Sequence, residues 1–407
     1  MPVTLRTSKH RVVILGGGYA GLTAAQRLCA QGDAISLTLV DEKSGFQERI
    51  RLHQVAAGQK IPSFSYRDFL EPKGVAFVQG QVITLNPALS KLSVRRPDGA
   101  VESLNYDYLI YALGSKIDAN TIPGVMEHAH AFLSVASAAR IYETLRLPKK
   151  SKVMVVGGGL TGIETVVELA ESLPDLHVSL AVDKPWIAES VPGGFSEKAV
   201  SYLSRALERH HVSLQTGIRV ESLNANVAQT TDGRDIPFDV CVWTSGFAPQ
   251  ALAREAGIDV NPRGQIVTDA ALRSVSHPNI IAIGDAAAVR TSGAGDCRMG
   301  CATGLAMATA GARTVFALSR GEIPPAFRFT YLFRNVSLGR KDGLIQFVDH
   351  CDVPRNFVWT GEKAAFWKEY ICRSTLSTIG LSAPEKMPAL PPIRMLPQLW
   401  RGIQQYA

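Results

Sequence analysis

The chain has 407 residues, a length that predicts two or three domains rather than one. Hydrophobic residues make up 46% and charged residues 19%, which excludes an intrinsically disordered chain. The formal net charge is +7, but lysine and arginine do not gather into runs, which argues against a nucleic-acid-binding protein. We find no uninterrupted apolar stretch of about 18 residues for a membrane span, and the polar N-terminus is typical of a cytoplasmic protein without a signal peptide.

A glycine-rich turn follows the first predicted strand. Residues 12–15 are apolar and lead into Gly16-Gly17-Gly18-Tyr19-Ala20-Gly21, after which small and apolar residues recur at helical spacing. A second predicted strand, 36–41, ends in Asp41, about 20 residues beyond the turn. In this pattern the glycines let the backbone approach a pyrophosphate at a helix N-terminus, and the acid accepts hydrogen bonds from a ribose. The segment therefore predicts a dinucleotide site.

Short antiparallel strands are predicted next, at 75–78, 81–85 and 91–94, with a turn at 96–99. A second copy of the glycine-rich unit follows in the sequence. An apolar stretch, 152–156, leads into Gly157-Gly158-Gly159-Leu160-Thr161-Gly162. Two such units predict one tightly held dinucleotide and one exchangeable dinucleotide.

The acid that closes the second unit bears on the choice of nucleotide. Asp183 ends the strand at 177–183, about 20 residues beyond Gly162. A carboxylate at this place repels a 2′-phosphate and favours NADH over NADPH, although the neighbouring Lys184 counteracts it.

The rest of the chain supplies further predicted elements. They are an antiparallel meander within 212–245, an apolar strand at 278–283 that ends in Gly284-Asp285, a helix from Cys301, strands at 336–348 and 357–361, a helix at 362–379 and an irregular proline-rich stretch at 382–397.

The order of these motifs, with Tyr106-Asp-Tyr-Leu-Ile-Tyr-Ala-Leu-Gly114 and Trp243-Thr-Ser-Gly246 between them, resembles the two-dinucleotide-binding flavoproteins (pyridine nucleotide–disulfide oxidoreductase superfamily). Among these the chain is most similar to type II NADH dehydrogenases and apoptosis-inducing-factor-like reductases. The resemblance implies an α/β fold with two Rossmann-like, three-layer domains and a small C-terminal α+β region. The implied domains are an FAD-binding domain (1–118 plus 247–325), an NAD(H)-binding domain (119–246) and a C-terminal region (326–407).

The same resemblance implies FAD as the bound cofactor and NADH as the exchangeable substrate, with NADPH as an open alternative. Asp285 is expected beside the ribityl chain, and the helix after it directs its N-terminus at the flavin, where it stabilises the negative charge of the reduced ring. The implied cofactor-binding residues are Gly16, Gly17, Gly18, Tyr19, Ala20, Gly21, Asp41, Glu42, Val82, Ala112, Gly114, Gly157, Gly159, Gly162, Glu164, Asp183, Gly246, Gly284, Asp285 and Ala302.

Two residues are candidates for catalysis. In the family that the chain resembles, the residue matching Glu164 lies near the nicotinamide–flavin stack; the alternative is an acid that complements the helix dipole. Cys301 ends the stretch Cys297-Arg-Met-Gly-Cys301 at a predicted helix start, which indicates either a thiol of lowered pKa or two small packing residues. Neither the redox cysteine pair of disulfide reductases nor a CxxC spacing is present, and we predict no metal site.

The predicted function is an FAD-dependent NADH dehydrogenase that passes electrons to a quinone-like acceptor. Members of the family usually carry glutamines near the quinone site on the helix after Gly-Asp, but the stretch 301–311 has none, which argues against quinone as the acceptor. The stretch instead predicts an apolar acceptor pocket. A bulky residue at Gly304 is then expected to slow only the reoxidation of the flavin. One alternative is a soluble reductase of a small organic molecule or an electron-carrier protein. Another is a redox-sensing flavoprotein.

The predicted helix at 362–379 combines aromatic and basic residues, a composition that suits contact with a partner. It combines Phe366, Trp367, Tyr370 and Ile371 with Lys363, Lys368 and Arg373, which favours either a membrane surface or a packing interface. We therefore expect a cytoplasmic enzyme, with peripheral contact to the inner face of a membrane as an open alternative. Its expected partners are a nicotinamide dinucleotide and a hydrophobic small molecule, without nucleic acid; a homodimer is also an open alternative.

Overall fold

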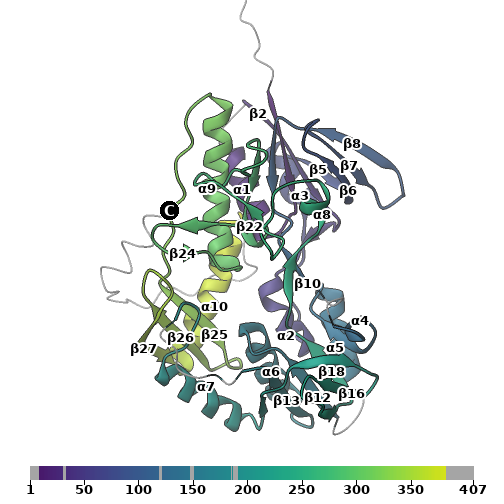
Figure 1. Ribbon diagram of the computed structural model, residues 1–407, viewed down its shortest axis with the longest axis vertical. Helices are drawn as coiled ribbons and strands as arrows, with labels where there is room; N and C mark the ends of the chain where they lie inside the picture. The colour runs from purple at the N-terminus through teal and green to yellow at the C-terminus, as the bar shows by residue number, and fades with distance from the viewer. Residues whose placement is uncertain are drawn as a thin grey trace, which may run out of the picture.

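The computed structural model describes residues 9–30, 34–118, 122–146, 151–184, 186 and 191–381. The predicted irregular stretch at 382–397 lies outside these residues. Figure 1 shows two α/β units along the long axis, one around β1 and β2 and one around β12 and β13, with the C-terminal strands β25–β27 and helix α10 at their side.

The first unit is built on a parallel sheet in the order β21-β9-β1-β2-β5. Apolar side chains from its strands, such as Ile14, Leu109 and Ile281, are fully buried. The expectation of an antiparallel strand at 75–78 is wrong, because this segment pairs in parallel with β2 and completes the Rossmann sheet. The sheet consists of β1 (His10–Leu15), β2 (Ile35–Asp41), β5 (Ala76–Gln79), β9 (Tyr108–Tyr111) and β21 (Ile280–Ala282).

Helices α1 (Tyr19–Cys29) and α9 (Cys301–Ser319) pack against each other beside this sheet. By length and composition α9 is apolar enough to span a membrane, but half of it is buried, as befits a core helix. The predicted antiparallel strands at 81–85 and 91–94 are confirmed as β6 (Gln81–Asn86) and β7 (Lys91–Arg95), joined by β8 (Val101–Asn105).

Further short elements come from the same parts of the chain, and one of them, the helix Leu52–Ala56, packs into the buried cluster of the second unit. They are β3 (Gly45–Phe46), η1 (Arg49–Arg51), α2 (Leu52–Ala56), β4 (Phe64–Ser65), α3 (Tyr66–Leu70), η2 (Glu71–Lys73), α8 (Leu252–Glu255), β20 (Ile266–Val267), η4 (Gly284–Ala286), β22 (Ala287–Ala288), β23 (Arg290–Thr291) and β24 (Gly295–Asp296).

The second unit repeats the design with a parallel sheet in the order β11-β18-β12-β13-β14. The antiparallel pair β10–β19 lies where the chain passes between the two units. The elements are β10 (Ser115–Ile117), α4 (Val125–His128), β11 (Ala129–Ala131), α5 (Val135–Leu145), β12 (Lys152–Val156), α6 (Leu160–Ser172), β13 (His177–Val182), α7 (Glu197–Arg209), β14 (Ser213–Thr216), β18 (Val240–Trp243) and β19 (Phe247–Pro249).

The predicted meander is confirmed within 212–245 as the antiparallel strands β15 (Val220–Leu223), β16 (Val227–Thr230) and β17 (Asp235–Pro237). Met154 and Trp243 of the second sheet share a buried cluster with Val220 of this meander, so it covers one face. Helices α5, α6 and α7 share the cluster of the other face.

The C-terminal region is an antiparallel sheet followed by a helix. The single strand predicted at 336–348 is wrong: the segment is a hairpin, because Leu338 and Asp342 close a turn and Gly339 takes a φ of +93° within it. The elements are β25 (Phe333–Ser337), β26 (Gly343–Val348), β27 (Pro354–Thr360) and α10 (Gly361–Thr378). The domain boundaries at 118/119, 246/247 and 325/326 stay a proposal.

Candidate functional site

The first glycine-rich turn is shaped for a phosphate group. Gly16 has a φ of +97°, and a Cβ there would lie 2.5 Å from the carbonyl oxygen of Ala112, so only glycine fits. Gly18 is the N-cap of α1, and a Cβ there would meet no atom within 4 Å. The positive end of α1 therefore faces open space, as pyrophosphate binding requires. Tyr19, Ala20 and Gly21 form the first turn of the helix.

Asp41 stabilises this turn through backbone hydrogen bonds. Its two carboxylate oxygens accept hydrogen bonds from the backbone N–H groups of Gly17 (2.7 Å) and Lys43 (2.8 Å). Burial raises the pKa of Asp41, and these two hydrogen bonds oppose the rise. Each oxygen keeps a further acceptor position, so contact with a ribose stays a prediction. Glu42 is exposed and pairs with Lys116 at 3.4 Å.

A second group of side chains lies beyond the ends of β9 and β21. Ser115 donates from Oγ to Asp285 Oδ2 (2.7 Å), and Arg49 donates from Nη1 to the carbonyl oxygen of Ser115 (2.7 Å). Sequence reasoning missed Arg49 and Ser115, because neither belongs to a spaced motif. The other expected residues near this end are Ala112 and Gly114 after β9, Gly246 before β19, Gly284 within η4 and Ala302 in α9, whereas Val82 lies on β6.

The second glycine-rich turn repeats the geometry of the first. Gly157 has a φ of +125°, and a Cβ there would lie 2.7 Å from the hydroxyl oxygen of Thr244. Gly159 is the N-cap of α6 and, like Gly18, has no atom within 4 Å of a built Cβ. Gly162 lies in the first turn of α6, and Asp183 follows β13 directly. The turn therefore fits a second pyrophosphate.

Glu164 lies at the centre of a buried ionic cluster. Its carboxylate accepts from Lys368 Nζ (2.8 Å) and from the backbone N–H of Ser337 (3.0 Å), and its other oxygen lies 3.8 Å from His53 Nδ1. Burial alone would raise the pKa of Glu164, but the charge and hydrogen bond of Lys368, with the hydrogen bond from Ser337, lower it. An acid held in this way is not merely a complement to the helix dipole.

His53 is held uncharged in this cluster. Burial lowers its pKa to about 4, although Glu164 opposes the shift. Its Nε2 atom has no hydrogen-bond partner among the described residues. His53 comes from α2, Glu164 from α6 and Lys368 from α10, so the cluster joins both Rossmann-like units to the C-terminal helix.

A shell of further ion pairs surrounds the cluster. Arg51 makes two hydrogen bonds of 2.9 Å to Glu369 and one of 3.1 Å to Glu48. One turn beyond Glu164, the fully buried Glu168 binds Arg340 at 2.7 Å. Sequence reasoning missed these pairs. Arg51–Glu369 and Glu168–Arg340 join residues far apart in the chain, and Glu48–Arg51 belongs to no motif.

Cys301 lies at the start of α9 beside this cluster. Of the two alternatives, the thiol of lowered pKa is not supported: burial raises the pKa of Cys301 to about 12 and that of Cys297 to about 11. The charge of Lys368 acts on Cys301 and opposes this rise. The apolar acceptor pocket expected here stays a prediction. A Cβ on Gly304 would lie 3.6 Å from Gly284 and 3.9 Å from Ala20, so this residue faces the core of the first unit.

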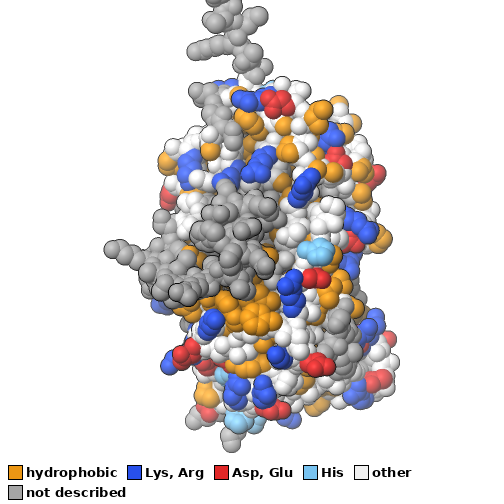
Figure 2. Space-filling view, turned by 90° about the vertical axis from the view of Figure 1, so that its left-hand side faces the viewer, with side chains coloured by type: hydrophobic (Ala, Val, Ile, Leu, Met, Phe, Trp, Pro, Cys, Tyr) orange, Lys and Arg blue, Asp and Glu red, His pale blue; other side chains and the backbone are white. Residues whose placement is uncertain are grey.

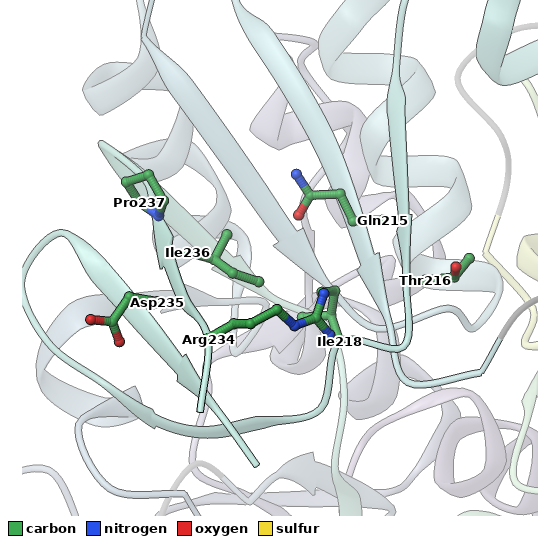
Figure 3. Close-up of a pocket in the computed structure, with 7 residues that line it drawn as sticks. All are labelled: Gln215, Thr216, Ile218, Arg234, Asp235, Ile236 and Pro237. Atoms are coloured by element: carbon green, nitrogen blue, oxygen red, sulfur yellow. The ribbon is translucent and has the colours of Figure 1, made fainter. Parts of the chain in front are cut away.

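A shallow pocket of about 360 Å³ lies between β14 and the meander. Figure 3 shows Arg234 extending across it toward Ile218, and Arg234 Nη2 donates to the carbonyl oxygen of Gly217 at 2.7 Å. Within the described part of the chain, no three His, Cys, Asp or Glu side chains are grouped to hold a metal ion.

Comparison with known proteins agrees with this geometry. Residues 10–311 match the family described as pyridine nucleotide-disulphide oxidoreductase. The chain is 31% identical over 331 residues to alternative NAD(P)H-ubiquinone oxidoreductase C1 of Arabidopsis thaliana, a match that covers 70% of the chain but only 62% of the plant enzyme. It is 25% identical over 400 residues to type II NADH:quinone oxidoreductase of Staphylococcus haemolyticus, which covers 91% and 96% of the two chains.

Solved structures share the fold. Sulfide:quinone oxidoreductase of Aquifex aeolicus superposes with a TM-score of 0.77 at 18% identity, over 93% of each chain. NDH2 of Plasmodium falciparum in complex with NADH superposes with a TM-score of 0.72 at 16% identity, over 92% of this chain and 97% of the other. The predicted arrangement of two dinucleotide-binding units is thereby confirmed.

Proposed function

Because the chain belongs to the pyridine nucleotide-disulphide oxidoreductase family, we propose that it is an FAD-dependent NADH:quinone oxidoreductase. The chain is thus an oxidoreductase, and the family implies use of a flavin and NAD(P)H. The observation that carries the proposal is the pair of glycine-rich turns, each of which leaves a helix N-terminus facing open space. The names of its relatives from Arabidopsis and Staphylococcus support quinone as the acceptor.

The choice of FAD, rather than a smaller flavin, rests on the first turn. Gly16, Gly18 and the N-terminus of α1 fit the pyrophosphate of a dinucleotide, with Asp41 at the adenosine end and Asp285 at the other. When bound, the flavin accepts a hydride from the nicotinamide and passes two electrons on. Arg49 and Ser115 orient the Asp285 carboxylate, which keeps an oxygen free to accept from a hydroxyl.

The choice of NADH rests on the second turn. Gly157, Gly159 and the N-terminus of α6 fit its pyrophosphate, and Asp183 stands where the adenosine ribose is bound in this fold. Its carboxylate favours free ribose hydroxyls over a 2′-phosphate.

Lys368 is the proposed proton donor on the acceptor side. Conversion of NADH, a quinone and one proton into NAD⁺ and a quinol takes up that proton from the protein. Lys368 Nζ is held protonated between Glu164 (2.8 Å) and the side-chain oxygen of Asn335 (2.9 Å), close enough to the start of α9 to act on Cys301. Because the thiols of Cys297 and Cys301 are protonated at neutral pH, they are not proposed as nucleophiles.

Peripheral contact with a membrane is proposed for the face around β27. Phe357 is 49% exposed there, and Lys363 lies over the ring of Trp359 at 3.9 Å. Figure 2 shows hydrophobic side chains gathered on this side of the molecule with lysine and arginine around them. The other basic residues of α10 do not join this face, because Lys368 binds Glu164 and Arg373 binds Glu369.

Three measurements on the purified holoprotein test the proposal. Denaturation releases FAD, one equivalent of NADH bleaches the flavin without oxygen, and a water-soluble short-chain quinone restores its colour in repeated turnovers. A screen with small organic oxidants and an iron–sulfur carrier protein is run in parallel. Release of FMN, or reoxidation by the carrier protein but not by the quinone, contradicts the proposal. Co-sedimentation with anionic vesicles, compared between the wild type and Phe357→Ser, tests the membrane contact.

A further inference from the structure

A basic residue outside the glycine-rich motifs lies beside Asp183, the acid proposed to contact the adenosine ribose. Asp183 follows β13 and is 55% exposed at its side chain, and Arg219 Nη1 lies 4.0 Å from its Oδ2 atom. Arg219 is 70% exposed and comes from the segment between β14 and β15. Such an exposed, long ion pair adds little to the stability of the fold. Its interest lies in its position at the end of β13, beside the second glycine-rich turn.

That place is the ribose end of the nucleotide site. In Rossmann units the acid after the second strand accepts from the 2′-hydroxyl, and an arginine nearby accommodates a 2′-phosphate. Here both groups stand together: Asp183 follows β13 as that acid follows the second strand, and Nη1 of Arg219 lies 4.0 Å from its carboxylate. We infer that Arg219 is a nucleotide-selecting residue that binds the 2′-phosphate of NADPH and so gives the enzyme use of both nucleotides. This inference rests on the proposed NADH site.

The segment that carries Arg219 is fixed in place. The backbone N–H of Ile218 donates to the carbonyl oxygen of Val182 (2.9 Å), which ties the segment to the end of β13. Thr231 N donates to the carbonyl oxygen of Arg219 itself (2.9 Å). Arg234 crosses the pocket of Figure 3 and donates to the carbonyl oxygen of Gly217 (2.7 Å). The backbone of Arg219 is therefore held beside Asp183, while its side chain keeps its donors free for a ligand.

Lys184 is the alternative cation. It adjoins Asp183 in sequence and is exposed, but it makes no ion pair among the described residues. A guanidinium can bind a phosphate through two parallel N–H groups, whereas an ammonium acts as a point charge. Arg219 is thus better suited to a phosphate on the 2′-oxygen than Lys184.

The test measures nucleotide binding without turnover. Titration calorimetry of the holoprotein with 2′,5′-ADP and with 5′-AMP reports the 2′-phosphate contribution as a ratio of dissociation constants. We expect Arg219→Ala to weaken 2′,5′-ADP by about tenfold, the usual effect of losing one charge-assisted hydrogen bond, and to leave 5′-AMP within about twofold. Asp183→Asn is expected to tighten 2′,5′-ADP by about tenfold, because a like charge is removed.

Lys184→Ala is the matched control and is expected to leave both constants within about twofold. Arg219→Lys keeps the charge and is expected to retain part of the 2′,5′-ADP affinity. If Arg219→Ala leaves the ratio unchanged, if Lys184→Ala changes it instead, or if the wild type binds neither nucleotide, the inference is overturned. Because no step involves the flavin or a quinone, these outcomes are separate from failure of the proposed electron transfer.

Discussion

Replacing Lys368 by methionine tests whether the buried cluster around Glu164 is held by this one cation. Methionine keeps most of the length of the side chain and removes the charge. Glu164 is 7% exposed, and its carboxylate would lose its 2.8 Å partner while keeping the 3.0 Å hydrogen bond from Ser337. Breaking a buried pair by removing one partner costs about 3–5 kcal/mol. Because the hydrogen bond from Ser337 remains, we expect the lower end, about 3 kcal/mol.

Thermal unfolding followed by circular dichroism measures this loss. A change of about 3 kcal/mol corresponds to a fall in Tm of roughly 6–12 °C for a cooperative unit of roughly 150–250 residues. Lys363→Met is the matched control, because Lys363 lies on the same helix but covers the ring of Trp359 at the surface. Its expected effect is below about 1 kcal/mol. Adding Glu164→Gln to Lys368→Met removes the unpaired charge and is expected to recover most of the loss.

The loss of stability in Lys368→Met is expected to depend on pH. In the wild type the pKa of Glu164 is lowered, so this group contributes stability above its unfolded value and loses it as the pH falls. Without Lys368, burial raises the pKa of Glu164, and stability is then lost as the pH rises through that raised value. The deficit of Lys368→Met is therefore expected to be larger at pH 8 than at pH 5. A deficit independent of pH, together with no recovery in the double variant, would refute the reasoning.

Three further outcomes are expected. Gly18→Leu places a side chain in the open space before α1, so the purified protein should lack flavin by its visible absorbance, while a folded circular-dichroism spectrum excludes simple unfolding. The pKa of His53 is lowered to about 4 in the folded protein, so below pH 6.5 the unfolded chain binds a proton that the folded protein does not. The free energy of unfolding, measured by urea titration, should therefore fall by up to about 2 kcal/mol from pH 7 to pH 5. His53→Leu should reduce this dependence on pH. Gly304→Ala should be tolerated, whereas Gly304→Leu should separate α9 from Ala20 and lower the unfolding free energy by about 1–3 kcal/mol, contrary to an effect on flavin reoxidation alone.

The two glycine-rich turns could be predicted from the sequence because their requirements are local. A positive φ at Gly16 and at Gly157 and an open helix N-cap at Gly18 and at Gly159 each restrict one residue type at a fixed spacing. The same spacing also predicts the strand before each turn and the helix after it. Such signals lie within a few residues of one another, and no tertiary contact is needed to read them.

Strand direction was harder to predict, since it depends on the partner. The segment that forms β5 is short and apolar, and its length suits either an antiparallel strand of the meander or a parallel strand at the sheet edge. Its pairing with β2 is decided by packing in the first unit. The hairpin of β25 and β26 was not predicted, although its turn, Gly339-Arg340-Lys341-Asp342, is polar and begins with glycine.

The charged cluster had no such signal, and this bears on how the enzyme is built. Glu164 stands in a motif that the sequence shows, but its partners His53 and Lys368 belong to no such motif. The aromatic and basic residues of the helix suggest a membrane face, yet the fold turns Lys368 inward. The carboxylate of Glu164 offsets the free-energy cost of burying the Lys368 charge, with a further hydrogen bond to Asn335. An isolated buried lysine would be forced to give up its proton, so Lys368 and Glu164 depend on each other. The acid of the nucleotide-binding motif and the C-terminal helix are therefore one electrostatic unit, and a change in either alters the charge state beside the start of α9.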